Sequence, residues 1–208
     1  GSFTGHPTPT PRPKDFYQTE YDVSSWDAIP VPSSWNIYGI QKDGSQKYGT
    51  PIYVNQPVIF QHSVKVDDWR GGVMRTPPAN WTTYKDRNEV GSFRRDFEIP
   101  QDWDGREVFI SFDGVDSFFY LWINGQYVGF SKNSRNTANF NITPYLQKGK
   151  NTVAAEVYRS SDGSFLEAQD MFRLPGIFRT VALYSVPKFI SVTWLPHPIW
   201  MRLIRTVL

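Results

Sequence analysis

Short apolar segments separated by turn signals constrain the fold of this chain more than any other feature. In residues 93–99, a mostly apolar face of Phe93, Arg95, Phe97 and Ile99 alternates with a charged face of Arg94, Asp96 and Glu98, which predicts a half-buried strand that ends at Pro100. Residues 117–123 are almost continuously apolar and precede Asn124-Gly125, a strong hairpin signal because both residues tolerate a positive φ. Similar patterns predict strands at 107–112, 126–130, 140–142, 152–158 and 180–184, and one helical turn at 143–146.

Strands of this length and spacing predict an all-β domain, an antiparallel two-sheet sandwich of the jelly-roll type. An immunoglobulin-like sandwich is the alternative, but its Cys…Trp…Cys signature is absent because the chain has no Cys. The same absence excludes a disulfide scaffold, a thiolate metal site and a Cys nucleophile. The aromatic content of 16%, together with 16 Pro and 15 Gly, agrees with an all-β domain.

The 208 residues divide into three predicted parts. Residues 1–11 are expected to be irregular, because the prolines that begin at Pro7 remove backbone donors and favour extended chain. Residues 12–187 are expected to form the sandwich, and residues 188–208 form a tail of different composition. Within the sandwich, the region 40–90 shows little alternation, so we expect it either to wrap over the sheet or to bind a ligand.

The net charge of +2 comes from the end of the chain. Residues 171–208 carry five basic residues and no acidic one, so residues 1–170 hold 17 basic against 20 acidic residues, a net charge of −3. A nucleic-acid-binding domain would carry its basic residues on the folded body, so nucleic acid is not an expected partner. No apolar run approaches the roughly 20 residues of a membrane-spanning helix, so a membrane is not expected either.

Three carboxylates cluster in the polar segment between two strongly predicted strands, which places them in a loop at one end of the sandwich. They are Asp162, Glu167 and Asp170. Two such groups could act as acid and base in glycoside hydrolysis, or they could cap turns and pair with Arg159 and Arg173. The residues favour the structural role for Asp162 and Glu167 and leave Asp170 undecided.

Several motifs occur in an order that resembles a known family. They are Val31-Pro32-Ser33-Ser34-Trp35, Pro51-Ile52-Tyr53-Val54-Asn55, Phe112-Asp113-Gly114-Val115-Asp116-Ser117, Leu121-Trp122-Ile123-Asn124-Gly125, Val128-Gly129-Phe130-Ser131, Gln169-Asp170-Met171 and Gly176-Ile177-Phe178-Arg179. Together they resemble the amino-terminal sugar-binding jelly-roll domain of family 2 glycoside hydrolases of the β-galactosidase type, over about residues 12–187.

The resemblance implies that this chain does not perform the chemistry itself. In the family, a (β/α)₈ barrel supplies both catalytic glutamates of a retaining mechanism, and immunoglobulin-like domains lie beside it. A barrel needs roughly 250 residues, so the present chain alone is expected to be inactive. A β-galactoside, the barrel and the immunoglobulin-like domains are therefore the implied partners.

Two residues of this chain match substrate-binding positions of the family. Asn55 matches an Asn that contacts the substrate, and Asp170 matches an Asp that binds galactose hydroxyls and helps to ligate a sodium ion. The chemistry is suitable, because an amide offers a donor and an acceptor while a carboxylate bridges hydroxyls and a hard cation. Sodium, through Asp170, and magnesium are expected only in the full enzyme.

The chain departs from the family at three places. Phe172 replaces a Trp, Pro175 replaces a small residue, and the family's first strand is missing, so we expect the sheet to lack this edge strand. Residues 191–208 contain no acidic residue, Lys or Gly where an immunoglobulin-like domain would begin. We interpret this tail as out of frame or artificially terminated; a membrane-surface anchor is the alternative.

Two other functions are compatible with the sequence. The chain could be a stand-alone carbohydrate-binding module that uses Trp69, Trp81 or Tyr84 as stacking platforms, or a purely structural assembly domain.

Overall fold

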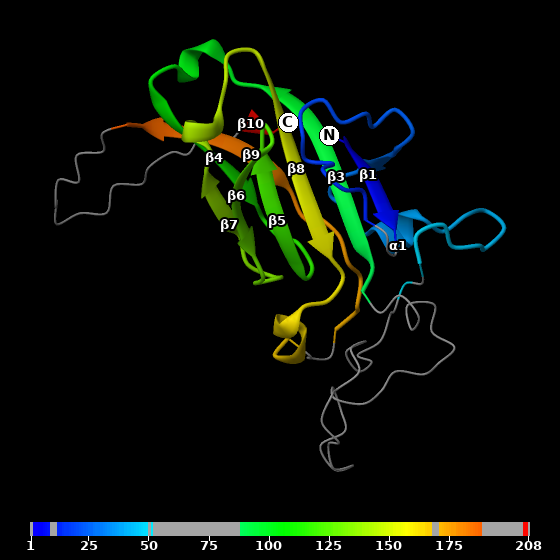
Figure 1. Cartoon of the computed structure of the whole chain (residues 1–208). Coiled ribbons are helices and arrows are strands. Elements are labelled where there is room, and N and C mark those ends of the chain that lie inside the picture. Colours follow the sequence, from blue (N-terminus) through cyan, green and yellow to red (C-terminus); the bar gives the residue numbers. More distant parts are fainter. Residues whose placement is uncertain are drawn as a thin grey trace.

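The computed structural model describes residues 2–8, 12–49, 51, 88–167, 171–188 and 206–207 (Figure 1). The strands are β1 (Ser2–Thr8), β2 (Asp27–Pro30), β3 (Val90–Glu98), β4 (Arg106–Phe112), β5 (Phe118–Ile123), β6 (Gln126–Ser131), β7 (Ala138–Asn141), β8 (Lys150–Tyr158), β9 (Val181–Pro187) and β10 (Thr206–Val207). The helical segments are α1 (Trp35–Tyr38) and the 3₁₀ turns η2 (Gln101–Trp103), η3 (Thr143–Tyr145) and η4 (Asp162–Phe165).

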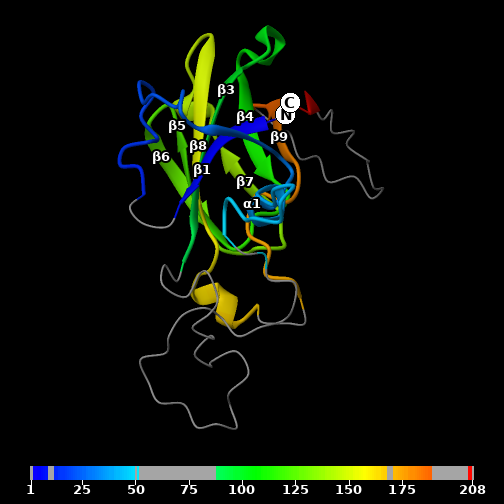
Figure 2. The ribbon, with the colours of Figure 1, turned by 90° about the vertical axis from the view of Figure 1, so that its right-hand side faces the viewer.

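These strands form two antiparallel sheets, which confirms the predicted all-β sandwich. One sheet has six strands in the order β2-β1-β3-β8-β5-β6, and the other has four in the order β10-β9-β4-β7. Figure 2 shows the two layers, with β5, β6 and β8 in one and β4, β7 and β9 in the other. All seven strands predicted from residue 93 onward are present.

The core lies between the two sheets. The inward residues of β5, at Phe119, Leu121 and Ile123, are at most 2% exposed. The ring of Phe119 lies 4.8 Å from that of Phe112 on β4, so the two sheets touch through aromatic side chains. Burying each side chain of this size contributes about 1.5–3 kcal/mol to the stability of the folded state, so burial of these residues favours the observed strand register.

The predicted hairpin is confirmed at Asn124-Gly125, where the φ values are 50° and 78°. The turn is fixed by the Asn124 side chain, whose Oδ1 accepts from the Thr152 amide at 2.8 Å. The predicted helical turn is also present as η3, with Pro144 in its first positions, and Gly149 follows with a φ of 77°. Local turn chemistry therefore sets this end of the sandwich.

The expectation for the N-terminus is wrong. Ser2–Thr8 is not irregular but forms β1, which pairs with β2 through residues 2–5 and with β3 through residues 4–8. The expected absence of a first strand is wrong too, because β1 is present, although it lies inside the six-stranded sheet and not at its edge. Pro7 is compatible with a strand here because it lies beyond Gly5, the last residue paired with β2, where β1 has a neighbour on one side only.

The outer face of β3 is also less exposed than the sequence predicts. Arg94, predicted on the polar face, is 5% exposed. Its guanidinium donates to the backbone carbonyls of Phe16, Thr19 and Tyr21 at 3.1, 3.0 and 2.9 Å. The coil before β2 therefore covers this face of the sheet, and its carbonyls replace the water that a charged group would otherwise need.

Little of the tail belongs to the described residues. Its Thr206 and Val207 form β10, which pairs with Leu183 and Ala182 of β9. The hypothesis of an out-of-frame tail concerns residues 191–208, most of which lie outside the described ranges. Among the residues that the structure describes, no helix is long and apolar enough to cross a membrane.

Candidate functional site

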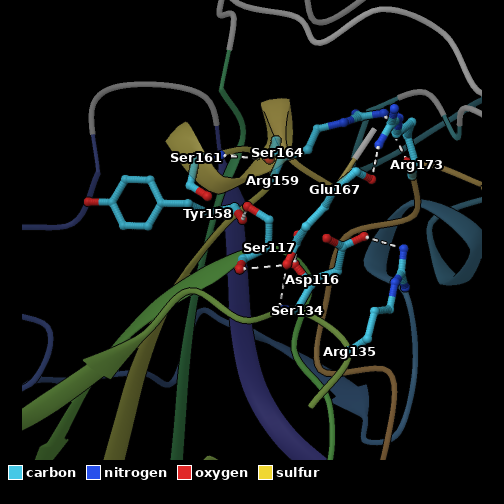
Figure 3. A network of polar contacts seen from close by, with 10 residues as sticks. All are labelled: Asp116, Ser117, Ser134, Arg135, Tyr158, Arg159, Ser161, Ser164, Glu167 and Arg173. Atoms are coloured by element: carbon cyan, nitrogen blue, oxygen red, sulfur yellow. Dashed lines mark hydrogen bonds and ion pairs between the residues drawn. The ribbon is translucent and has the colours of Figure 1, made fainter. Parts of the chain in front are cut away.

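Three loops meet at one end of the sandwich, and their polar side chains form one network (Figure 3). The loops are residues 113–117 between β4 and β5, 132–137 between β6 and β7, and 159–180 between β8 and β9. We refer to this group as the loop-end network. Its members from these loops are Asp116, Ser134, Arg135, Arg159, Glu167 and Arg173, and it also includes Asn36 of α1 and Glu89, which precedes β3.

Asp116 lies at the centre of the network. Its amide and carbonyl pair with the backbone of Gly176 at 3.0 and 3.1 Å, and its carboxylate lies 3.7 Å from Arg135 Nη2. The residue is 8% exposed, and this burial raises the pKa of the Asp116 carboxyl to about 6, although the charge of Arg135 opposes the shift. Asp116 therefore changes charge close to neutral pH.

Gly176 cannot be replaced without moving the backbone beside it. Its φ is 136°, and a Cβ atom there would lie 2.6 Å from the carbonyl oxygen of Ser33. The amide of Ser33 in turn donates to the Ile177 carbonyl at 2.9 Å. The chain that follows the Asp170 loop is therefore held firmly against the segment before α1.

Asp162 and Glu167 have the structural roles that the sequence favoured. Their carboxylates have partners other than arginine side chains, while Arg173 Nη1 donates to the backbone carbonyl of Glu167 at 3.3 Å. Asp162 pairs with Lys132 Nζ at 3.0 Å and accepts from the Gly163 amide at 2.8 Å. Glu167 accepts from the Ser134 amide at 3.1 Å and contacts the Ser134 hydroxyl. Neither carboxylate is therefore arranged as the acid or base of a hydrolytic pair.

A buried ion pair connects β3 to the end of β8. Arg159 Nη1 lies 2.6 Å from Glu89 Oε2, and the two side chains are 2% and 9% exposed. Asn36 Nδ2 also lies 3.2 Å from Glu89 Oε2. Because removing a partner would leave a buried charge alone, this pair fixes the two segments relative to each other.

The same region brings together both ends of the long segment 52–87. A Cβ atom on Gly49 would lie 2.2 Å from Glu89 Oε1, so the residues on either side of this segment touch. Asn88 exchanges two hydrogen bonds with the backbone of Ser160, at 2.8 and 2.9 Å. The flank that follows the segment containing Asn55 is therefore bonded to the start of the loop that contains Asp170, and the flank before it lies against Glu89.

Both sequence-predicted site residues, Asn55 and Asp170, lie outside the described residues, as do Trp69, Trp81 and Tyr84. The roles assigned to them stay predictions. The described parts of the chain contain no group of three or more His, Cys, Asp or Glu side chains that could hold a metal ion. The implied sodium and magnesium sites also stay predictions.

Some polar atoms of the network are buried and have no hydrogen-bond partner among the residues that the structure describes. They are Nε and Nη2 of Arg173 and Oδ1 of Asn36. Burial lowers the pKa of Arg173, while the nearby charge of Asp116 opposes this effect. An unpaired buried polar group costs about 1–3 kcal/mol, so these atoms lower the stability of the network.

The sequence does not indicate that Asn36, Glu89 and Ser134 belong to the loop-end network. Each is separated by tens of residues from the group that it contacts, so no local pattern indicates its role. The one available signal is that Asn88-Glu89 directly precedes a strong strand, where a loop meets the sheet.

Comparison with known proteins decides the family. Residues 2–187 match the family described as "Glycosyl hydrolases family 2, sugar binding domain". This chain belongs to that family. The match confirms the resemblance found in the sequence motifs, and it begins within β1, in agreement with the corrected N-terminus.

The related proteins of this family are much longer than the present chain. It is 42% identical over 177 residues to a β-galactosidase of Priestia megaterium, which covers 85% of this chain and 15% of that protein. It is 36% identical over 189 residues to a β-galactosidase large subunit of Lactobacillus helveticus, and this alignment covers 86% of the present chain and 27% of the subunit. The chain therefore spans less than a third of the length of these relatives.

Solved structures agree on the fold. The chain is similar to a β-glucuronidase from glycoside hydrolase family 2, with a TM-score of 0.60 and 19% identity over 89% of this chain and 17% of the other. A Bacteroides uniformis β-glucuronidase gives a TM-score of 0.59 and 21% identity over the same shares. These likenesses support the jelly-roll sandwich.

Proposed function

We propose that this chain is the amino-terminal sugar-binding domain of a larger β-galactosidase and that it forms the rim of the galactose pocket without performing the chemistry. The observation that carries the proposal is the 42% identity to a β-galactosidase, of which the chain spans only 15%. The parent enzyme then hydrolyses terminal β-galactosides by a retaining mechanism, and its barrel supplies both catalytic glutamates.

The loop-end network supports this division of labour. The segment with Asn55 and the loop with Asp170 are anchored at one place, through Glu89 and Arg159. An Asn amide there donates to and accepts from a sugar hydroxyl, while an ionised Asp accepts hydroxyl protons and contacts a sodium ion. The sodium site needs further ligands from the barrel, so the isolated chain holds the ion poorly.

A chimeric enzyme tests the proposal. Residues 2–187 replace the matched segment of the Priestia megaterium β-galactosidase, and kcat/KM is measured with nitrophenyl β-galactoside, β-glucuronide and β-mannoside. We expect the chimera to hydrolyse the galactoside in preference to the other two, and the isolated 208-residue chain to hydrolyse none. A folded chimera that prefers another glycoside, or turnover by the isolated chain, would contradict the proposal.

A further inference from the structure

A second surface of the molecule carries aromatic side chains that the loop-end network does not use. A groove of about 710 Å³ lies on the outer face of the six-stranded sheet, over β5, β6 and β8. Its aromatic lining residues are Phe16, Tyr17, Tyr120, Trp122, Tyr127 and Tyr158. We refer to it as the aromatic groove.

The strand geometry explains why so many rings gather on this face. The period of two along β5 places Phe118, Tyr120 and Trp122 outward, because Phe119 and Leu121 point into the core. A bulge in β6 opposite Leu121 and Trp122 lets Tyr127 contact Tyr120, although Phe130, three residues later, contacts it too. Tyr127 and Phe130 remain 51% and 52% exposed.

One pair of rings forms a rigid wall of the groove. Tyr17 and Trp122 are stacked at a centroid distance of 5.0 Å and an angle of 9°. The buried ring of Phe16 contacts Trp122 edge-on at 5.8 Å and 76°. The coil before β2 therefore fixes the orientation of Trp122, so a ligand would meet a platform that needs no reordering.

Charged side chains lie among these rings. Arg12 Nη1 pairs with Glu156 Oε1 at 2.9 Å, and both groups contact the hydroxyl of Tyr158. Burial and the hydrogen bond to Glu156 raise the pKa of Tyr158, so this hydroxyl keeps its proton. Lys14 and Asp15 add one charge of each sign to the lining, so the four charged groups sum to zero.

This combination suits a sugar better than it suits a protein surface or a charged polymer. Protein interfaces are rich in Tyr, Trp and Arg, but they are depleted of Lys, Glu and Asp, and this lining contains Lys14, Asp15 and Glu156. A lining of zero net charge gives no attraction to an acidic glycan or nucleic acid. A pyranose ring offers apolar C–H faces to aromatic rings and hydroxyls to carboxylate and guanidinium groups.

We infer that the aromatic groove binds a neutral oligosaccharide of pyranose units. The row of rings begins beside the loop-end network, because Phe118 follows Ser117 and Tyr158 precedes Arg159. It continues along β5, whose six residues extend over about 17–20 Å, which is long enough for several sugar units. The groove therefore holds a glycan chain on a surface other than the proposed galactose pocket.

Titration of the full 208-residue chain tests this inference. The probes are β-1,4-galactotetraose and cellotetraose, with tetragalacturonate as the acidic comparison, and binding is followed by calorimetry and by NMR. We expect at least one neutral tetrasaccharide to bind and the acidic one to bind more weakly. Tyr127→Ala weakens binding by about tenfold, which corresponds to about 1.4 kcal/mol, and Glu156→Gln also weakens it.

Tyr184→Ala is the matched control. Tyr184 stacks on Phe109 at 5.2 Å and 9°, on β9 and β4 of the other sheet, so its loss leaves the aromatic groove intact and binding unchanged. Absence of binding by the unaltered chain would overturn the inference. Equal weakening of binding by Tyr127→Ala and Tyr184→Ala would overturn it too. So would a result in which Asp170→Asn abolishes oligosaccharide binding while Tyr127→Ala binds as tightly as the unaltered chain.

The galactosidase chimera separates this inference from the proposed function. Tyr127→Ala is expected to leave kcat/KM for a nitrophenyl galactoside unchanged. Turnover of the galactoside therefore tests the proposed function, and oligosaccharide binding tests the aromatic groove. Hydroxyl-radical labelling of Tyr127 in the chimera should be strong without sugar and weaker with tetrasaccharide. Full protection without sugar would show that another domain covers the groove, and would overturn the inference.

Discussion

The two ends of the sandwich hold their loops with polar networks of opposite character. At the hairpin end, the network consists of neutral amides, and Asn151, which is fully buried, uses all its hydrogen-bonding capacity. Its Oδ1 accepts from Gln147 N and Asn124 Nδ2 at 2.9 and 2.8 Å, and its Nδ2 donates to the carbonyls of Gln147 and Gly149 at 3.0 and 2.9 Å. Nothing in this network titrates near neutral pH.

The loop end is charged and only partly satisfied. Glu89, Arg159 and Asp116 are buried there, and two buried donor atoms of Arg173 have no partner within the described part of the chain. A fully satisfied neutral network stabilises a turn, whereas a charged network with unused donors costs stability and is retained where a ligand is bound. The difference assigns a structural role to the hairpin end and supports a binding role for the loop end.

The largest predicted effect comes from breaking the buried ion pair at the loop end. Arg159→Ala leaves the Glu89 carboxylate buried without a counter-ion, with only the hydrogen bond from Asn36, so we expect the free energy of unfolding to fall by about 3–5 kcal/mol. Urea unfolding at pH 7 measures the change. The double variant Glu89→Gln/Arg159→Met should recover most of the loss, and a loss below about 1 kcal/mol in Arg159→Ala would contradict burial of the pair.

The next effect is a pH dependence that only the loop end should show. The pKa of Asp116 is raised from 3.8 to about 6 in the folded chain, so between these values the folded state binds more protons than the unfolded state. Stability from this group is therefore greatest below pH 3.8 and is lost as pH rises through 6, by roughly 3 kcal/mol in total.

Asp116→Asn should remove this dependence, because the amide does not titrate. Unfolding free energies at pH 4.5, 6 and 7.5 for the two proteins give the comparison. If the two curves remain parallel, Asp116 is ionised in the folded state at all three values and the account of its burial fails.

A smaller, pH-independent effect is expected at the hairpin end. Asn151→Ala removes four hydrogen bonds and leaves their partners unpaired, so we expect a loss of about 2 kcal/mol. The loss should be the same at pH 5 and pH 8, measured by thermal unfolding. A loss that varies with pH would show that the two ends are coupled.

The sequence predicts the hairpin end better than the loop end, for a physical reason. Asn124, Gly125 and Gly149 act through local backbone conformation, so their roles are visible in a short window. The Glu89–Arg159 pair joins residues 70 positions apart, so it exists only once β3 and β8 are adjacent. The same reason hides β1, whose pairing with β3 outweighs the local preference of its proline.

The placement of the candidate site was only partly predictable. The clustering of Asp162, Glu167 and Asp170 in one sequence segment indicates the loop between β8 and β9. That this loop is bonded to the flank of the segment containing Asn55 depends on Asn88 and Ser160, 72 positions apart, which no sequence pattern connects.

Two variants of the chimeric β-galactosidase test most directly whether the loop end binds sugar and the hairpin end does not. Asp170→Asn should lower kcat/KM for a galactoside by about 100-fold, as expected for loss of hydrogen bonds to a charged group, with an unchanged melting temperature. Asn124→Ala should lower the melting temperature and leave kcat/KM unchanged. The opposite pattern, with full activity in Asp170→Asn and lost activity in a folded Asn124→Ala, would contradict the account.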